Sequence, residues 1–294
     1  MARRPRQRLA TMGRERMGEN KTAQRWARPS ASASASASAS GSGSGSVLAL
    51  DFDGVVCDSS GESSVSAWDA ARVVWPEVFA TGAAAGDGVK SRVIEETSRV
   101  RPIVETGYEN LLLARALLER RASVDEILAD WGRLLPQLMA EWGCERGNLV
   151  EAFGDARDSW IKNDPETWIQ HNRIYPGVGV ALEKALRRDD LDVYIVTTKQ
   201  TRYVVRILSQ LADIDFPDAK VISSTVSGIP KATAINELME KHADVSSWHF
   251  VEDRFETLDG MPAASEMRKD LRMYLADWGY NVQRERDAAA GSGS

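Results

Sequence analysis

Cysteine and histidine are scarce in this chain of 294 residues. The two cysteines, Cys57 and Cys144, are too few for a disulfide framework and lack the paired spacing of a structural zinc site. The three histidines, His171, His242 and His249, show no metal-ligand spacing either. The sequence therefore predicts a protein of a reducing compartment without a transition-metal site.

Long apolar runs are missing as well. No segment approaches the roughly 20 consecutive apolar residues that a helix needs to cross a bilayer. We therefore expect no membrane insertion.

Positive charge is concentrated in the first 28 residues and is deficient in the rest of the chain. Of 37 Lys and Arg and 43 Asp and Glu in total, residues 1–28 hold nine basic and two acidic residues. The remainder therefore carries a formal charge of −13. Non-specific binding to nucleic acid depends on basic side chains that neutralise phosphates, so we expect no nucleic-acid partner.

The first 46 residues cannot form a packed core. Residues 1–30 are rich in Arg, and residues 31–46 are Ala-Ser and then Gly-Ser repeats, which predicts a disordered segment over 1–46. An Arg-rich, acid-poor segment suits a transit peptide to the chloroplast or another organelle. The alternative is a flexible tail or linker on a cytoplasmic protein. The Gly-Ser ending at 291–294 favours the linker, and we expect a flexible tail over 284–294.

The remaining residues alternate between strand-like and helix-like patterns on either side of a long helical stretch. A short apolar run at 47–50 predicts a buried strand. After residue 190, we expect strands at 192–197, 220–224, 248–252 and 271–276, separated by helices at 202–211, at 231–241 and near 255. Strands separated by helices predict an α/β fold with a doubly wound, parallel-sheet core over 47–58 and 191–283. The sequence does not indicate an oligomeric state.

Residues 59–190 predict an inserted helical cap without strands. Ser123 and Glu126 have the spacing of a capping box at the start of an amphipathic helix. Pro136 should kink that helix, since proline removes a backbone hydrogen bond.

Polar side chains follow the predicted strands at the points where the strands end. In open parallel sheets, ligands bind beyond the carboxyl ends of the strands. Asp51 and Asp53 leave the first strand, and their spacing of two points both the same way. The other residues at strand or helix ends are Thr197, Thr198, Lys231, Glu252 and Asp253.

This order of motifs resembles the haloacid dehalogenase superfamily, whose pattern is a DxD strand end, a Thr or Ser strand end, a Lys and an acidic strand end. The resemblance covers about residues 47–280 and implies a phosphohydrolase. It implies that Asp51 attacks phosphorus, that Asp53 serves as general acid and base, and that Thr197 and Lys231 contact the phosphoryl group. Asp53 also separates the phosphoryl-transfer branch from the dehalogenases, which lack this second aspartate.

The resemblance also implies a Mg²⁺ ion. A carboxylate that attacks a phosphate dianion brings like charges together, and a hard cation with oxygen ligands screens them. Asp51, Asp253 and the backbone carbonyl of Asp53 would hold the ion.

The fourth motif departs from the family pattern. The usual second acid lies neither four nor five residues after Asp253, which leaves Glu256 or Asp259 as a substitute. Glu252 stands where a glycine is common, and it would orient Lys231 or support the metal.

The position of the cap between the first and second motifs looks like that of phosphoglycolate phosphatase and β-phosphoglucomutase relatives. This implies a small phosphorylated metabolite as the substrate. Arg101 in the cap would read a substrate anion, or it belongs to an internal ion pair. A non-catalytic scaffold and a phosphotransferase or mutase of the same fold are the alternative functions.

Overall fold

The computed structural model describes residues 45–80, 86, 88–261 and 271–292. All but the last two residues of the predicted disordered segment, 1–46, lie outside this described part. The described residues belong to one compact unit, Gly43–Ser294. No helix within the described ranges is both long and apolar enough to span a membrane.

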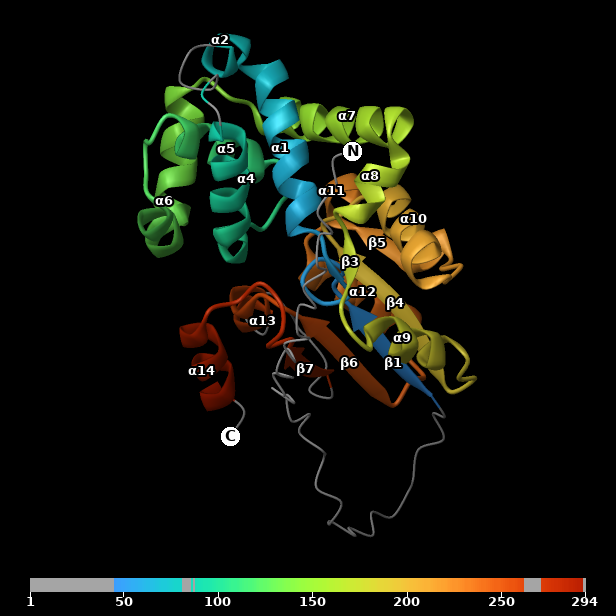
Figure 1. The fold of residues 1–294 in the computed structure, drawn as a ribbon. Coiled ribbons are helices and arrows are strands. Elements are labelled where there is room, and N and C mark those ends of the chain that lie inside the picture. The colour runs from blue at the N-terminus through green and yellow to red at the C-terminus, as the bar shows by residue number, and fades with distance from the viewer. Residues whose placement is uncertain (1–44, 81–85, 87, 262–270, 293–294) are drawn as a thin grey trace, which may run out of the picture. The chain divides into compact units, whose positions relative to one another are not determined.

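A five-stranded sheet forms the core, and every pair of neighbouring strands is parallel. The strand order is β5-β4-β1-β6-β7, so β1 is central and β4 and β6 flank it (Figure 1). The strands are β1 (Ser46–Leu50), β4 (Leu191–Thr197), β5 (Val221–Ser223), β6 (Ser247–Glu252) and β7 (Leu271–Leu275).

Helices cover both faces of this sheet because side chains alternate along each strand. Leu48 and Leu50 of β1 pack into the apolar cluster that contains Leu182 and Ile207. Val47 and Ala49 of β1 pack into the opposite cluster, together with residues of the helix that begins at Lys231. The predicted α/β fold with a doubly wound parallel sheet is confirmed.

The helices around the sheet follow the predicted rhythm. They are α9 (Val178–Leu186), α10 (Thr201–Ala212), η2 (Asp218–Lys220), α11 (Ser224–Ser227), α12 (Lys231–Lys241), α13 (Phe255–Gly260) and α14 (Gln283–Ser292). Helix α9 lies inside the predicted insert, yet its apolar side, with Leu182, packs into the core cluster. The predicted flexible tail differs from helix α14, whose start is fixed by a hydrogen bond from Val282 N to the Glu285 carboxylate.

A second group of helices lies apart from the sheet and forms the cap (Figure 1). Its cluster of buried apolar side chains runs from Ala67 to Phe153. The helices are α1 (Ser60–Val74), α2 (Pro76–Phe79), α4 (Val89–Arg99), η1 (Arg101–Ile103), α5 (Glu109–Leu118), α6 (Val124–Glu141), α7 (Arg146–Asn163) and α8 (Pro165–Gln170). The predicted insertion of helices after the first strand is confirmed.

Two local predictions about the insert need correction. A short ribbon pairs β2 (Cys57–Asp58) with β3 (Arg173–Ile174), although no strand was expected in 59–190. Two residues are too few to produce an alternating pattern. Helix α6 has the predicted capping box at Ser123 and Glu126, but its break lies at Asp130 (φ −154°, ψ 46°) rather than at Pro136. The Asp130 carboxylate pairs with Arg133, so the chain starts a new helical segment ahead of the proline.

Candidate active site

The topology of the sheet brings the predicted motifs together. Asp51 follows the central strand β1, Thr197 ends β4, and Glu252 ends β6. Because these three strands are adjacent and parallel, their carboxyl ends meet at one edge of the sheet. Residues separated by about two hundred positions in the sequence therefore share one site.

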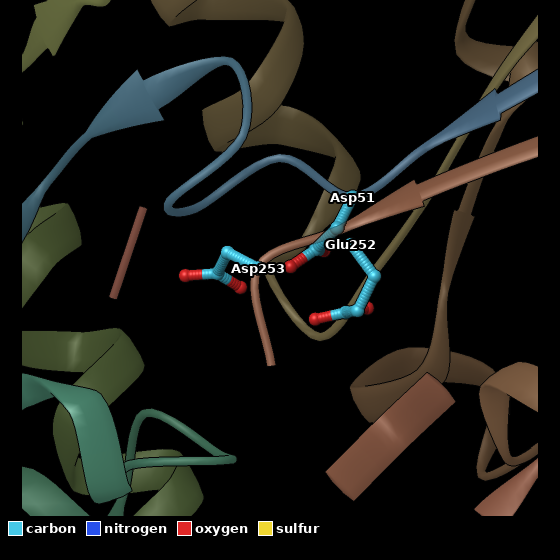
Figure 2. Close-up of side chains that lie close together, drawn as sticks. All are labelled: Asp51, Glu252 and Asp253. Atoms are coloured by element: carbon cyan, nitrogen blue, oxygen red, sulfur yellow. The ribbon is translucent and has the colours of Figure 1, made fainter. Parts of the chain in front are cut away.

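Three buried carboxylates form the centre of this site. Asp51, Glu252 and Asp253 each offer an oxygen, and these oxygens lie within 4.8 Å of one another (Figure 2). Their residues are only 5%, 0% and 2% exposed. Buried acids of like charge repel one another unless a cation lies between them or beside them.

Lys231 supplies one such positive charge from the first residue of α12. Its Nζ lies 2.7 Å from Glu252 Oε2 and 3.1 Å from Asp51 Oδ1. Burial would lower the pKa of Lys231, but the adjacent Asp51 and Glu252 outweigh burial and raise it. Lys231 is therefore a fixed cation in the position that the sequence predicted for it.

One lysine leaves the acidic cluster under-compensated. Burial raises the pKa of Asp51 to about 6, with Lys231 opposing and Glu252 adding to the rise. Burial, followed by the charges of Glu252 and Asp51, raises the pKa of Asp253 well above its ordinary value. Asp51 Oδ1 is buried and accepts no hydrogen bond from any described residue. A hard divalent cation, which prefers carboxylate oxygens, fits this donor set.

Asp53 has a different environment from Asp51. Lys199 Nζ lies 3.0 Å from Asp53 Oδ1, and Ser59 Oγ donates to the same oxygen over 2.6 Å. Burial would raise the pKa of Asp53, but the charges of Lys199 and Arg101 outweigh burial and lower it to about 2. Asp53 is therefore ionised at neutral pH in the free protein.

The carboxylates open onto a pocket of about 450 Å³, a size suited to a small molecule. The predicted residues on its wall are Asp51, Asp53, Arg101, Thr198, Lys231, Asp253 and Glu256. Among the described residues, Thr197 and Asp259 are not part of this wall.

The two threonines at the end of β4 differ in their surroundings. Thr197 is 1% exposed, and its Oγ1 accepts a hydrogen bond from Lys199 N over 3.1 Å. Thr198 lines the pocket, and its hydroxyl donates to the Glu105 carbonyl over 3.1 Å. The structure therefore presents Thr198, which was predicted as a supporting residue, to the pocket.

The fourth motif likewise differs from a simple substitution. Glu256 lines the pocket but is exposed and pairs with Arg254 over 2.7 Å. Asp259 is exposed. Glu252, one residue before Asp253, is the acid that completes the buried cluster.

Arg101 reaches the site from the cap. Its guanidinium lies 4.3 Å from the centre of the Tyr280 ring, and its Nη1 donates to the Val104 carbonyl over 3.0 Å. Its Nε is buried and has no hydrogen-bond partner within the described ranges. Burial would lower the pKa of Arg101, but Tyr280, Asp53 and Asp253 raise it. Arg101 is therefore a fixed cation on the pocket wall with an unused donor.

Three buried charged residues near the site were missed by the sequence analysis: Lys199, Glu62 and Arg157. Lys199 follows Thr198 at the exit of β4, so the rule that strand ends carry the site residues would have included it. No sequence pattern marks Glu62 or Arg157, which come from α1 and α7 of the cap.

Gly54 allows Asp253 to approach the first motif. Its φ of +87° lies in the left-handed region, and a Cβ at this position would come within 1.8 Å of Asp253 Oδ2. The close approach leaves the Asp253 carboxylate in place to accept the Tyr280 N–H over 2.8 Å.

We predict that Gly54→Ala weakens divalent-cation binding at least about tenfold, because the new methyl group displaces Asp253 from the cluster. The measurement is a Mg²⁺ titration by calorimetry. Gly177→Ala is the matched control, since Gly177 has a similar φ of +83° but no atom within 4 Å of an added Cβ. Equal Mg²⁺ affinities in the two variants would contradict the role given to Gly54.

Comparison with known proteins agrees with this geometry. The family described as haloacid dehalogenase-like hydrolase matches residues 46–264. The chain belongs to this family. No curated protein matches this haloacid dehalogenase-like hydrolase.

Several solved structures are similar to this haloacid dehalogenase-like hydrolase at low sequence identity. A predicted phosphatase from Clostridium acetobutylicum is 15% identical with a TM-score of 0.46, over 83% of this chain and 90% of that chain. A predicted phosphoglycolate phosphatase from Haemophilus somnus is 18% identical with a TM-score of 0.46, over 81% and 87%. A haloacid dehalogenase-like family protein from Streptococcus pneumoniae is 15% identical with a TM-score of 0.47, over 82% and 89%.

Proposed function

We propose that this hydrolase is a magnesium-dependent phosphatase that acts on a small phosphorylated metabolite and uses Asp51 as its nucleophile. The observation that carries the proposal is the arrangement of Asp51, Glu252 and Asp253 around an unpaired Asp51 oxygen, with Lys231 beside it and Asp53 on the same pocket wall. A carboxylate, a cation site and a second acid at one pocket meet the needs of phosphoryl transfer.

Asp51, Asp253 and the backbone carbonyl of Asp53 would hold Mg²⁺. When bound, the ion offsets the repulsion between the phosphate and the attacking carboxylate and stabilises charge that develops on the phosphoryl oxygens. Glu252 lies in the same cluster and accepts from Lys231, so it would keep the lysine beside Asp51.

Asp51 forms a bond to phosphorus, and the bond from phosphorus to the ester oxygen breaks. Asp53, which is ionised in the free protein, receives a proton as the ester binds and passes it to the leaving oxygen. Water then attacks the aspartyl-phosphate, Asp53 takes up a proton from this water, and phosphate leaves. Lys231 and Thr198 face the pocket and would contact the phosphoryl oxygens; Thr197 would orient this loop.

Arg101 would give the site a contact from the cap. Its buried, unpartnered Nε and its position on the pocket wall suit a hydrogen bond to an oxygen of the substrate. Because Arg101 belongs to the cap and the acids belong to the sheet, the cap would select the substrate while the core performs the reaction.

Phosphate release from p-nitrophenyl phosphate tests the proposal. We expect release at least about tenfold faster with Mg²⁺ than with excess EDTA, because the acidic cluster is under-compensated without a cation. A folded wild-type protein that releases no more phosphate than Asp51→Asn under either condition would support a non-catalytic scaffold instead. Conversion of a sugar phosphate to its isomer, without free phosphate, would support a mutase.

A further inference from the structure

A buried network of alternating charges lies behind the pocket. Glu62 of α1 is 0% exposed and accepts from Arg157 of α7 through both carboxylate oxygens, each over 2.7 Å. Lys199 Nζ lies 3.7 Å from Glu62 Oε2 on one side and 3.0 Å from Asp53 Oδ1 on the other. The network therefore connects two helices of the cap to Asp53 through one lysine of the core.

The two lysines of the site differ in what they can reach. Lys231 lines the pocket with Asp51, whereas Lys199 is not among the described residues of the pocket wall. The side chain of Lys199 is only 1% exposed, against 13% for Lys231. Lys199 is therefore placed to act on Asp53 and not on a molecule in the pocket.

The contacts of Asp53 distinguish its two oxygens. Oδ1 accepts from Ser59 Oγ over 2.6 Å and from Lys199 Nζ over 3.0 Å. Oδ2 has the longer contact to Lys199, 3.4 Å. Two short hydrogen bonds occupy Oδ1, so Oδ2 is the oxygen that remains available to exchange a proton with a substrate.

We propose that Lys199 is a positioning residue for the acid–base function of Asp53: together with Ser59 it holds Oδ1, so that Oδ2 faces the reaction, and Glu62 and Arg157 hold the ammonium group in place. This inference rests on the proposed phosphatase function. In the first step, the O–H bond on Oδ2 breaks and the proton goes to the ester oxygen as the bond from phosphorus to that oxygen breaks. In the second step, Oδ2 takes one proton from water, and the remaining hydroxide oxygen bonds to phosphorus.

The position of Oδ2 matters most when the leaving group is a strong base. A basic leaving oxygen needs the proton as it departs, whereas p-nitrophenolate leaves as a stabilised anion without one. The specificity constant kcat/KM reports the steps up to the departure of this group. Loss of positioning should therefore change the ratio of kcat/KM between two esters, whereas general damage to the fold would lower both equally.

The test compares phenyl phosphate with p-nitrophenyl phosphate, which are similar in shape. We expect Lys199→Met to lower kcat/KM for phenyl phosphate at least about tenfold and for p-nitrophenyl phosphate less than about threefold. Lys199→Arg, which keeps a cation at this position, should recover part of the loss for phenyl phosphate. If Lys199→Met does not fold, the nearly isosteric Glu62→Gln takes its place, and we expect the same selective loss.

Asp53→Asn separates failure of this inference from failure of the proposed function. Asp53→Asn should show the same selectivity with a larger loss, since it removes the acid itself. Equal losses for both esters in Lys199→Met, with a selective loss in Asp53→Asn, would overturn the positioning role alone. Equal losses for both esters in Asp53→Asn would remove the acid–base role of Asp53, and this inference with it.

Discussion

Asp51→Asn is expected to lower kcat for phosphate release by at least about 10⁴-fold. An amide in place of the carboxylate has neither the charge nor the nucleophilic oxygen needed to attack phosphorus. Asparagine has nearly the same size, and Asp51 Oδ1 accepts no hydrogen bond from the described residues. The substitution also removes one acid from a cluster whose repulsion and burial raise the pKa of Asp51 to about 6. The variant should therefore unfold at the same temperature as the wild type or at a higher one.

Steady-state phosphate release and thermal unfolding, measured without metal, check both halves of this prediction. Asp189→Asn is the matched control, because Asp189 is exposed between α9 and β4. It should leave both measurements unchanged. A folded Asp51→Asn variant that keeps more than about one hundredth of the wild-type rate would exclude Asp51 as the nucleophile.

The sheet was predictable from the sequence because its strands are short apolar runs between amphipathic helices. The prediction of a helix over 231–241 matches α12, and the strand expected at 192–197 is β4 with one more residue. Parallel strands buried on both faces leave this pattern whatever their order in the sheet. The order itself, with β1 between β4 and β6, follows from the structure and explains why Asp51, Thr197 and Glu252 meet.

The long-range contacts of the site were not predictable in the same way. A strand end indicates the edge of the sheet at which a side chain lies, but not which neighbour it contacts. Thr197 and Thr198 are adjacent in sequence, and only the local path of the backbone places Thr198 on the pocket wall. The pairing of Glu62 with Arg157 depends on how α1 packs against α7, which involves apolar contacts along both helices and no motif.

The hinge-side ribbon of β2 and β3 illustrates the same limit. Cys57 pairs with Ile174 and Asp58 with Arg173, where the chain leaves and re-enters the region of the sheet. Tyr280 supports this ribbon, because its hydroxyl donates to Asp58 Oδ1 over 2.8 Å while its backbone N–H donates to Asp253. These contacts join three distant segments, so no local pattern in any one of them could reveal the arrangement.

Glu62→Ala is expected to lower the free energy of unfolding by about 3–5 kcal/mol, the largest effect on stability that we predict. The pair of Glu62 and Arg157 is buried, with side chains 0% and 8% exposed. Removing the carboxylate leaves the Arg157 guanidinium and the Lys199 ammonium without their shared partner in a site that water does not reach. Urea unfolding at neutral pH provides the measurement. Glu183→Ala is the matched control: its ion pair with Arg187 is 50% and 75% exposed, so its loss should change stability by less than about 1 kcal/mol.

The pH dependence of unfolding separates the charge of Glu62 from its packing. Burial would raise the pKa of Glu62, but Arg157 and Lys199 outweigh burial and lower it below its ordinary value of 4.5. A carboxyl group whose pKa is lower in the folded protein stabilises the fold above its unfolded pKa and loses this contribution as pH falls through its folded pKa. The wild-type protein should therefore lose stability more steeply below pH 4.5 than Glu62→Gln, which has no proton to take up at this position. Parallel pH profiles for the two proteins would show that the carboxylate is not ionised in the folded protein, because only an ionised group gives the predicted difference.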